Sequence, residues 1–176
     1  MALSGTHSLP NLVRSNFSFL QALPANTEEI LLSLIRTIIV FRCLIDLAGC
    51  GLDLGSMGVE NGQLNFPLGV GLLSNGIVVV SEWGGNRLQI FGSRGEFVRE
   101  IGFGLLENPW HLFVDSDDNI LVADSGNNFI QLFYRNGTHI KSIGSGRISS
   151  PCGVCMNREG RIIVAEGDEG HRISIF

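Results

Sequence analysis

The sequence predicts an all-β protein, a partial β-propeller of about three four-stranded blades. The first observation is a period of 42 residues, because Pro67, Pro109 and Pro151 each open the same pattern. The second is the order within that pattern, in which short apolar runs alternate with turns rich in Gly, Asn and Asp. A repeat of this length is typical of small β units that bury their apolar faces against their neighbours.

Each repeat divides into short predicted strands separated by turns of the kind that tight hairpins need. In the first repeat, residues 66–102, we expect strands at Leu68–Leu73, Ile77–Ser81, Arg87–Phe91 and Phe97–Ile101. In the second, residues 108–144, we expect them at Trp110–Asp115, Ile120–Ala123, Phe129–Phe133 and His139–Ile143. In the third, residues 150–176, we expect three strands at Cys152–Met156, Ile162–Ala165 and Arg172–Phe176.

The second and third strands carry different patterns. The second strand of each unit is apolar on both faces, which predicts a strand sandwiched between neighbouring sheets. The third strand alternates, so that Leu88 and Ile90 share one face while Gln89 lies on the other. An acid recurs at the end of the second strand, as Glu82, Asp124 and Glu166. Recurrence predicts a structural role, in which each carboxylate accepts backbone N–H groups or pairs with Arg87 or Arg172.

Composition sets limits on the partners. The formal net charge is −5, so a general affinity for nucleic acid is not indicated and an anionic partner would need a local basic patch. Four cysteines are too few for a disulfide scaffold in a chain of 176 residues. We therefore expect reduced thiols and a cytoplasmic location.

The first 51 residues do not match the repeat and form a leader of unknown role, irregular or helical. Residues 28–47 suit a helix, although the β-branched run at 38–41 equally suits a strand. The apolar stretch from Ile30 to Leu47 is interrupted by three charged residues. A spanning helix needs about 20 mostly apolar residues, so no membrane span is predicted.

The repeated motifs of residues 52–176 resemble the NHL repeat. The match rests on Val122-Ala123-Asp124, on Val164-Ala165-Glu166 and on Asn86-Arg87-Leu88-Gln89-Ile90-Phe91, which occur in register. NHL repeats are best known as six-bladed propellers at the C-terminus of TRIM-NHL and other RING-finger proteins, many of which are ubiquitin ligases. The resemblance implies binding of RNA or protein through a face of loops. The RING carries the ligase activity, and this chain lacks the Cys/His cluster that a RING requires.

Four features depart from that pattern. Phe129 stands in place of an arginine, His111 stands in place of a glycine, and the third unit carries an extra residue around Gly167-Asp168-Glu169. In addition, fewer than three full units are present, and a propeller must pair its last blade with its first to avoid exposed sheet edges. We expect either a fragment of a longer propeller or self-association that completes the ring.

The functional hypothesis is a non-catalytic binding module that recruits a protein, or a single-stranded or hairpin RNA, through its loop face. Aromatic rings among arginines suit both kinds of partner. The candidate residues are Trp83, Arg87, Trp110, His111, Phe129, Arg147, His171 and Arg172. One alternative is a scaffold that binds protein only.

A less favoured alternative is an enzyme similar to the metal-dependent amidating lyase of peptide hormones. That reading requires several converging histidines, and His111 is the only good candidate. Cys152 and Cys155 have zinc-like spacing, but positions i and i+3 of a strand point to opposite faces. No catalytic residue, metal site or cofactor is predicted.

Overall fold

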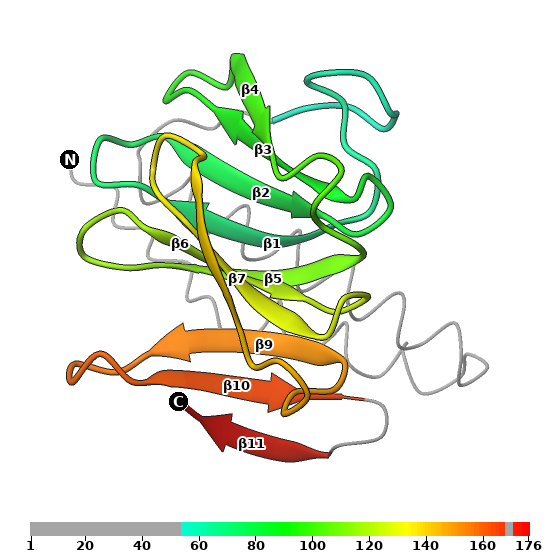
Figure 1. Ribbon diagram of the computed structural model, residues 1–176. Helices are drawn as coiled ribbons and strands as arrows, with labels where there is room; N and C mark the ends of the chain where they lie inside the picture. The colour runs from blue at the N-terminus through cyan, green and yellow to red at the C-terminus, as the bar shows by residue number, and fades with distance from the viewer. Residues whose placement is uncertain (1–53, 168–170) are drawn as a thin grey trace, which may run out of the picture.

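The computed structural model describes residues 54–167 and 171–176, which form eleven β-strands in three antiparallel sheets (Figure 1). The first sheet contains β1 (Pro67–Leu72), β2 (Val78–Glu82), β3 (Arg87–Phe91) and β4 (Phe97–Ile101). The second contains β5 (Pro109–Val114), β6 (Ile120–Asp124), β7 (Phe129–Phe133) and β8 (His139–Ile143). The third contains β9 (Pro151–Met156), β10 (Ile162–Glu166) and β11 (Arg172–Ile175). The predicted all-β class is confirmed.

Two predictions fall outside the described residues. The leader, with its helix or strand, lies in the first 53 residues, and the extra residue of the third repeat lies among residues 168–170. In the described residues, 54–167 and 171–176, there is no helix long and apolar enough to cross a membrane.

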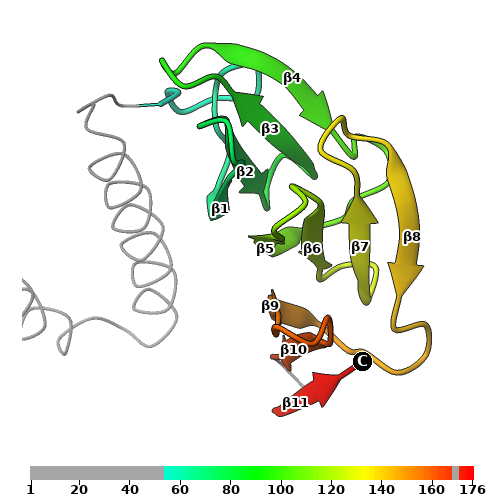
Figure 2. The ribbon, with the colours of Figure 1, turned by 90° about the vertical axis from the view of Figure 1, so that its left-hand side faces the viewer.

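The three sheets are stacked as consecutive blades. Figure 2 shows β1, β5 and β9 side by side along one edge of the stack, with β4 and β8 along the opposite edge. Within each sheet the strands follow one another in chain order, so every blade is a simple meander. This is the arrangement of propeller blades around a central axis, with the first strand of each blade innermost.

One end of this stack carries two sets of loops, which we call the loop face. Its first set joins the second and third strands of each blade, at residues 83–86 and 125–128 and, in the third blade, at the described residues 167 and 171. Its second set leads into the innermost strands, at residues 54–66, 102–108 and 144–150. Backbone hydrogen bonds join the two sets, from Gly84 to Asn65, from Gly126 to Glu107 and from Gly167 to Ser150.

The apolar cores lie between the blades. Leu88 and Ile90 of the first blade pack with Leu112, Ile120 and other residues of the second. A second core forms in the same way between blades two and three. The second strands of blades one and two are buried on both sides, as predicted: Val79 belongs to the core between these blades, while Val80 belongs to a separate cluster. In β10 the prediction holds for one side only, since Ile163 and Ala165 are half-buried. Each buried aliphatic side chain contributes about 1.5–3 kcal/mol.

The observed strands differ from the predicted ones by one residue at several ends. The innermost strands begin at the repeated prolines, and the second strands extend to include the recurring acid. Proline is accepted at the first residue of a strand, where its missing N–H is not needed by the ladder. The last strand ends at Ile175, although Phe176 and Ile162 still exchange two backbone hydrogen bonds.

Gly69 allows the innermost strands of blades one and two to approach closely. A Cβ added there would lie 2.6 Å from Ser81 Oγ, 3.0 Å from Leu112 N and 3.1 Å from His111 Cα. His111 occupies the equivalent position in the second blade, where its ring, although exposed, accepts the Val154 N–H of β9 at 3.4 Å. The glycine-to-histidine departure therefore places an imidazole between β5 and β9, whereas Gly69 lets β1 and β5 approach closely.

We predict that Gly69→Ala lowers the free energy of unfolding by about 1–3 kcal/mol, because the added methyl group forces two backbones apart. Gly167→Ala is the matched control, since the nearest atom to its added Cβ lies at 3.6 Å. The control should change stability by less than about 0.5 kcal/mol. Urea denaturation measures both, and equal effects of the two substitutions would contradict the close-approach explanation.

Candidate functional site

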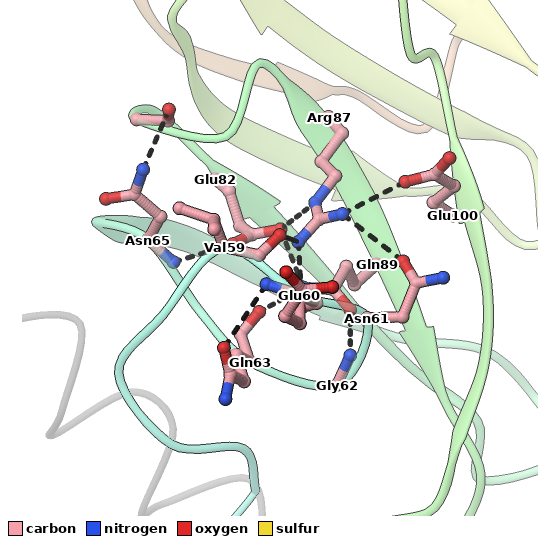
Figure 3. Close-up of polar contacts among 11 residues, drawn as sticks. Val59, Glu60, Asn61, Gly62, Gln63, Asn65, Glu82, Arg87, Gln89 and Glu100 are labelled. Atoms are coloured by element: carbon pink, nitrogen blue, oxygen red, sulfur yellow. Dashed lines mark hydrogen bonds and ion pairs between the residues drawn. The ribbon is translucent and has the colours of Figure 1, made fainter.

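A carboxylate holds the first blade to the loop that precedes it (Figure 3). Glu82, the last residue of β2, accepts the backbone N–H of Asn65 at 2.6 Å through one oxygen. Its other oxygen accepts Arg87 Nε at 2.7 Å and Gln89 Nε2 at 2.8 Å. Gln89 Oε1 in turn accepts the N–H of Gly62 at 2.8 Å. The predicted polar face of β3 is thus turned into the protein and supports the incoming loop.

Arg87 is not available to a partner. Its side chain is 8% exposed, and hydrogen bonds lead from its three nitrogens to five acceptors. Besides Glu82, these are Glu100 on β4, Asn61, and the carbonyl oxygens of Val59 and Glu60 (Figure 3). A guanidinium has five N–H groups, so its donor capacity is matched by acceptors within the protein. The lead-in loop folds over Arg87, so this residue does not lie on the exposed part of the loop face.

The third blade repeats this cluster with a more exposed arginine. Glu166 accepts the N–H of Ser149 at 2.8 Å, Arg172 Nε at 2.9 Å and the hydroxyl of Ser174. Arg172 Nη2 also donates to the carbonyl oxygen of Arg147 at 2.7 Å. The hydrogen bond from Arg172, helped by those from Ser174 and Ser149, lowers the pKa of Glu166 to about 2. The carboxylate therefore stays charged at neutral pH.

The second blade builds the cluster without a cation. Asp124 accepts the N–H of Glu107 at 2.8 Å, Gln131 Nε2 at 2.8 Å and Asn127 Nδ2 at 2.9 Å. Phe129 stands where the other blades have arginine, so burial dominates and raises the pKa of Asp124. In this blade Phe129 replaces the arginine, and the side-chain amide of Asn127 replaces the guanidinium as the third donor to the carboxylate. In all three blades the predicted structural role of the acid is confirmed.

Three aromatic residues lie exposed near the junction of blades one and two. Phe66 and Trp83 form an edge-to-face pair with ring centroids 6.0 Å apart, and they are 50% and 39% exposed. Trp110, at the start of β5, is 39% exposed, and its carbonyl oxygen accepts the Ser81 hydroxyl at 2.9 Å. Asn108 Nδ2 donates to the carbonyl oxygen of Trp83, so the loop before Trp110 is tied to the loop that carries Trp83.

An asparagine ties each of the first two blades to the next on this face. Asn86 Oδ1 accepts the N–H of Asn108 at 2.8 Å, and Asn128 Oδ1 accepts the N–H of Ser150 at 2.7 Å. All four residues have positive φ, between 43° and 62°. Asparagine is among the residues that adopt this conformation most readily. The loop face is therefore a connected surface rather than a set of separate loops.

The remaining predicted residues lie in different settings. His111 is exposed on β5, with its Nδ1 bonded to Val154 of blade three, and partial desolvation there lowers its pKa. Phe129 is half-buried in the place of the arginine. Arg147 is exposed, with its guanidinium carbon 5.0 Å from the centroid of the Phe176 ring. His171 and Arg172 are exposed at the third blade. Among the predicted residues, Trp83 contacts the ring of Phe66, Arg147 lies over the ring of Phe176, and Arg172 donates to the carbonyl oxygen of Arg147.

Phe66 is a residue that the sequence analysis missed. Phe103 and Leu105 were missed as well, and both are exposed in the loop before β5, at 74% and 37%. The signal was present, since Phe66 occupies the repeat position of Asn108 and Ser150. An aromatic residue that breaks the repeat at an exposed turn indicates a requirement other than folding.

Within residues 54–167 and 171–176, no group of three or more His, Cys, Asp or Glu side chains is placed to hold a metal ion. The Cys155 thiol is free and exposed, and the Cys152 thiol donates to the carbonyl oxygen of Ala165 at 3.5 Å. All buried side-chain nitrogen and oxygen atoms of the same residues have a hydrogen-bond partner.

We predict that stability falls in acid partly through Glu166. Its folded-state pKa lies below its ordinary value, so its contribution is complete above about pH 4.5 and is lost as pH falls toward about 2. Glu166→Gln should remove that part of the pH dependence, measured by urea denaturation between pH 2 and pH 6. Glu159→Gln is the control, because its ion pair with Arg161 is more than 60% exposed on both sides. A wild-type slope in Glu166→Gln would contradict the assignment.

No protein-family model matches this sequence, and no curated protein matches it either. The NHL resemblance therefore stays an interpretation of the motifs. Solved structures do match. They include hydrazine synthase from Kuenenia stuttgartiensis, with 17% identity and a TM-score of 0.56 over 71% of this chain and 36% of that one.

A streptogramin B lyase matches with 18% identity and a TM-score of 0.54, over 71% of this chain and 43% of that chain. The virginiamycin B lyase of Staphylococcus aureus matches with 17% identity and a TM-score of 0.52, over the same shares. This chain therefore spans less than half the length of these solved proteins. At such low identities the likeness shows the fold alone, and it establishes that the chain folds as propeller blades.

Proposed function

We propose that this chain is a non-catalytic module that binds a protein through its loop face. The observation that carries the proposal is the exposed aromatic pair of Phe66 and Trp83, with Trp110 also exposed at the start of the neighbouring blade. Aromatic side chains, tryptophan and tyrosine above all, provide much of the binding energy of protein interfaces because they are large and lose little conformational entropy. Large apolar side chains that are exposed close together are typical of an interaction site.

The backbone beneath these rings is firmly held. The Glu82 cluster fixes the loop that carries Phe66, and the Asn86–Asn108 hydrogen bond fixes the loop before Trp110. A partner therefore meets a surface that is already ordered, so that no binding free energy is lost in ordering these loops. This supports recognition by a rigid surface rather than by a flexible loop.

The charges favour a protein partner over RNA. Of the arginines predicted for this face, Arg87 is buried and Arg172 pairs with Glu166. Arg147 stacks on Phe176 and lies at the third blade, away from the aromatic group. Binding of single-stranded nucleic acid needs cations that contact the phosphates beside the stacked bases. With a net charge of −5, the chain offers few such contacts.

The proposal leaves catalysis out for a chemical reason. The three carboxylates on this face are saturated by structural donors, and His111 accepts a backbone N–H. None of these groups is left poised to transfer a proton or to attack a substrate. The free thiol of Cys155 is compatible with the proposed cytoplasmic location.

We predict that Trp83→Ala weakens the binding of peptides that the wild-type protein selects. Peptides enriched from a random display library on the wild-type protein should bind Trp83→Ala at least about tenfold more weakly, measured by fluorescence anisotropy. Tyr134→Ala is the matched control, because Tyr134 is 52% exposed on a turn at the opposite ends of the strands. Equal losses in both variants would contradict a loop-face site.

A random pool of single-stranded RNA, titrated at several salt concentrations, separates the two kinds of partner. The proposal expects no enrichment of RNA on the wild-type protein. Tight RNA binding that weakens steeply with salt and requires Trp83 would overturn the protein assignment in favour of nucleic acid.

A further inference from the structure

The exposed charges of the loop face are divided between its two halves. The loops that the first two blades contribute contain two acids, Glu60 and Glu107, and no arginine, lysine or histidine. The third blade carries Arg147, His171 and Arg172 on the same face, and all three are exposed. A surface with one sign of charge favours a ligand of the opposite sign. The half formed by blades one and two therefore suits a cationic group.

The two acids have no partner within the part of the chain that the structure describes. Glu60 and Glu107 are exposed, and neither carboxylate takes part in a hydrogen bond or an ion pair with residues 54–167 or 171–176. The two acids next to Arg87 differ, because Glu82 and Glu100 are both bonded to its guanidinium. The free acids are thus open to a cation from another molecule.

The second blade adds a further negative charge beneath its loops. Asp124 is bonded to neutral donors, since Phe129 takes the place of the arginine found in the other blades. Burial raises the pKa of Asp124, and the negative charge of the neighbouring Glu107 acts in the same direction. Two carboxylates therefore lie close together in this blade, without a cation from the described residues to balance them.

The exposed aromatic residues lie beside these carboxylates. Asn108 follows Glu107 in the chain, and its Nδ2 donates to the carbonyl oxygen of Trp83 at 3.3 Å. Trp110 lies two residues further along, at the start of β5. Phe66 packs against Trp83 with an angle of 77° between the ring planes. The aromatic rings and the free acid thus come from loops that are tied to each other.

We propose that this half of the loop face binds an arginine side chain of the partner protein. The inference rests on the proposed function, and it names the group that the partner presents. A guanidinium stacks on an aromatic ring and can donate two parallel hydrogen bonds to a carboxylate at the same time. Phe66, Trp83 and Trp110 offer the rings, and Glu107 offers the carboxylate.

The chain makes both kinds of contact with its own arginines elsewhere. The guanidinium of Arg147 lies over the ring of Phe176, 5.0 Å from its centroid, and Arg87 Nε donates to Glu82 at 2.7 Å. At the aromatic pair of Phe66 and Trp83, none of the described residues supplies a guanidinium to the rings. A partner arginine would supply there what Arg147 supplies at the third blade.

Apolar residues beside this site favour a protein segment over a small cation. Phe103 and Leu105 are 74% and 37% exposed in the loop that leads to Glu107. An exposed ion pair alone stabilises a complex little, so most of the affinity has to come from apolar contacts around it. We therefore expect the arginine to be flanked by apolar side chains of the partner.

Two peptide display libraries test the inference on the full chain. They differ at one central position, which is fixed as arginine in one and as glutamate in the other, while the remaining positions are random. The wild-type protein should enrich peptides from the arginine library. Exchange of that arginine for citrulline, which keeps the shape and removes the charge, should weaken binding at least about fivefold in fluorescence anisotropy. Added salt should weaken the arginine peptide more than the citrulline peptide.

Glu107→Lys reverses the charge without altering the rings. It should weaken the arginine peptides at least about tenfold and shift enrichment toward the glutamate library. Asp117→Lys is the matched control, because it changes the net charge equally and Asp117 is exposed on a turn at the opposite end of the strands. The control should bind the arginine peptides as the wild-type protein does.

The outcomes separate this inference from the proposed function. Peptides that require Trp83 but tolerate citrulline, or that bind Glu107→Lys as well as Asp117→Lys, would overturn the arginine assignment and leave the loop-face site standing. Absence of enrichment from both libraries would overturn both proposals. The citrulline exchange is made in the peptide, so its result does not depend on the folding of a variant.

Discussion

The carboxylate at the end of each second strand is the interaction on which the rest of this structure depends. Glu82, Asp124 and Glu166 each accept the N–H of the loop that enters their own blade. That loop carries a buried aliphatic residue into an apolar core: Leu106 and Ile148 enter the cores shared with the preceding blade, and Leu64 enters the cluster on the outer side of blade one. One buried acid therefore couples the end of a sheet, the connection between blades and the packing at the junction.

The cluster tolerates different chemistry because only its geometry is required. An arginine balances the acid in blades one and three, whereas Asn127 and Gln131 supply the donors in blade two. The effect of the missing cation is seen in the pKa values: that of Asp124 is raised by burial, whereas that of Glu166 is lowered by its hydrogen bond from Arg172. A buried carboxylate is stable when its oxygens are saturated by donors, and a full positive charge is one way among several to achieve this.

The same periodicity explains both the blade junctions and the loop face. Each blade buries one flat side on the next, as between blades one and two and between blades two and three. Loops at one end of the strands are free to vary, because the carboxylate clusters hold their backbone. Phe66, Trp83 and Trp110 occupy such positions. Solved proteins with similar blades include lyases and a hydrazine synthase, so the fold by itself does not specify the chemistry.

The sequence by itself determined the blades. A 42-residue period with two-sided apolar strands and Gly/Asn turns has few other solutions, and the strands lie within one residue of the predicted ends. It also identified the recurring acids as structural. Tertiary structure alone decided which exposed residues lie together. It buried Arg87 beneath residues 59–61, turned His111 toward Val154 and paired Phe66 with Trp83. These outcomes depend on how loops from successive blades fold over one another, and a local pattern contains no information about contacts between segments so far apart in the chain.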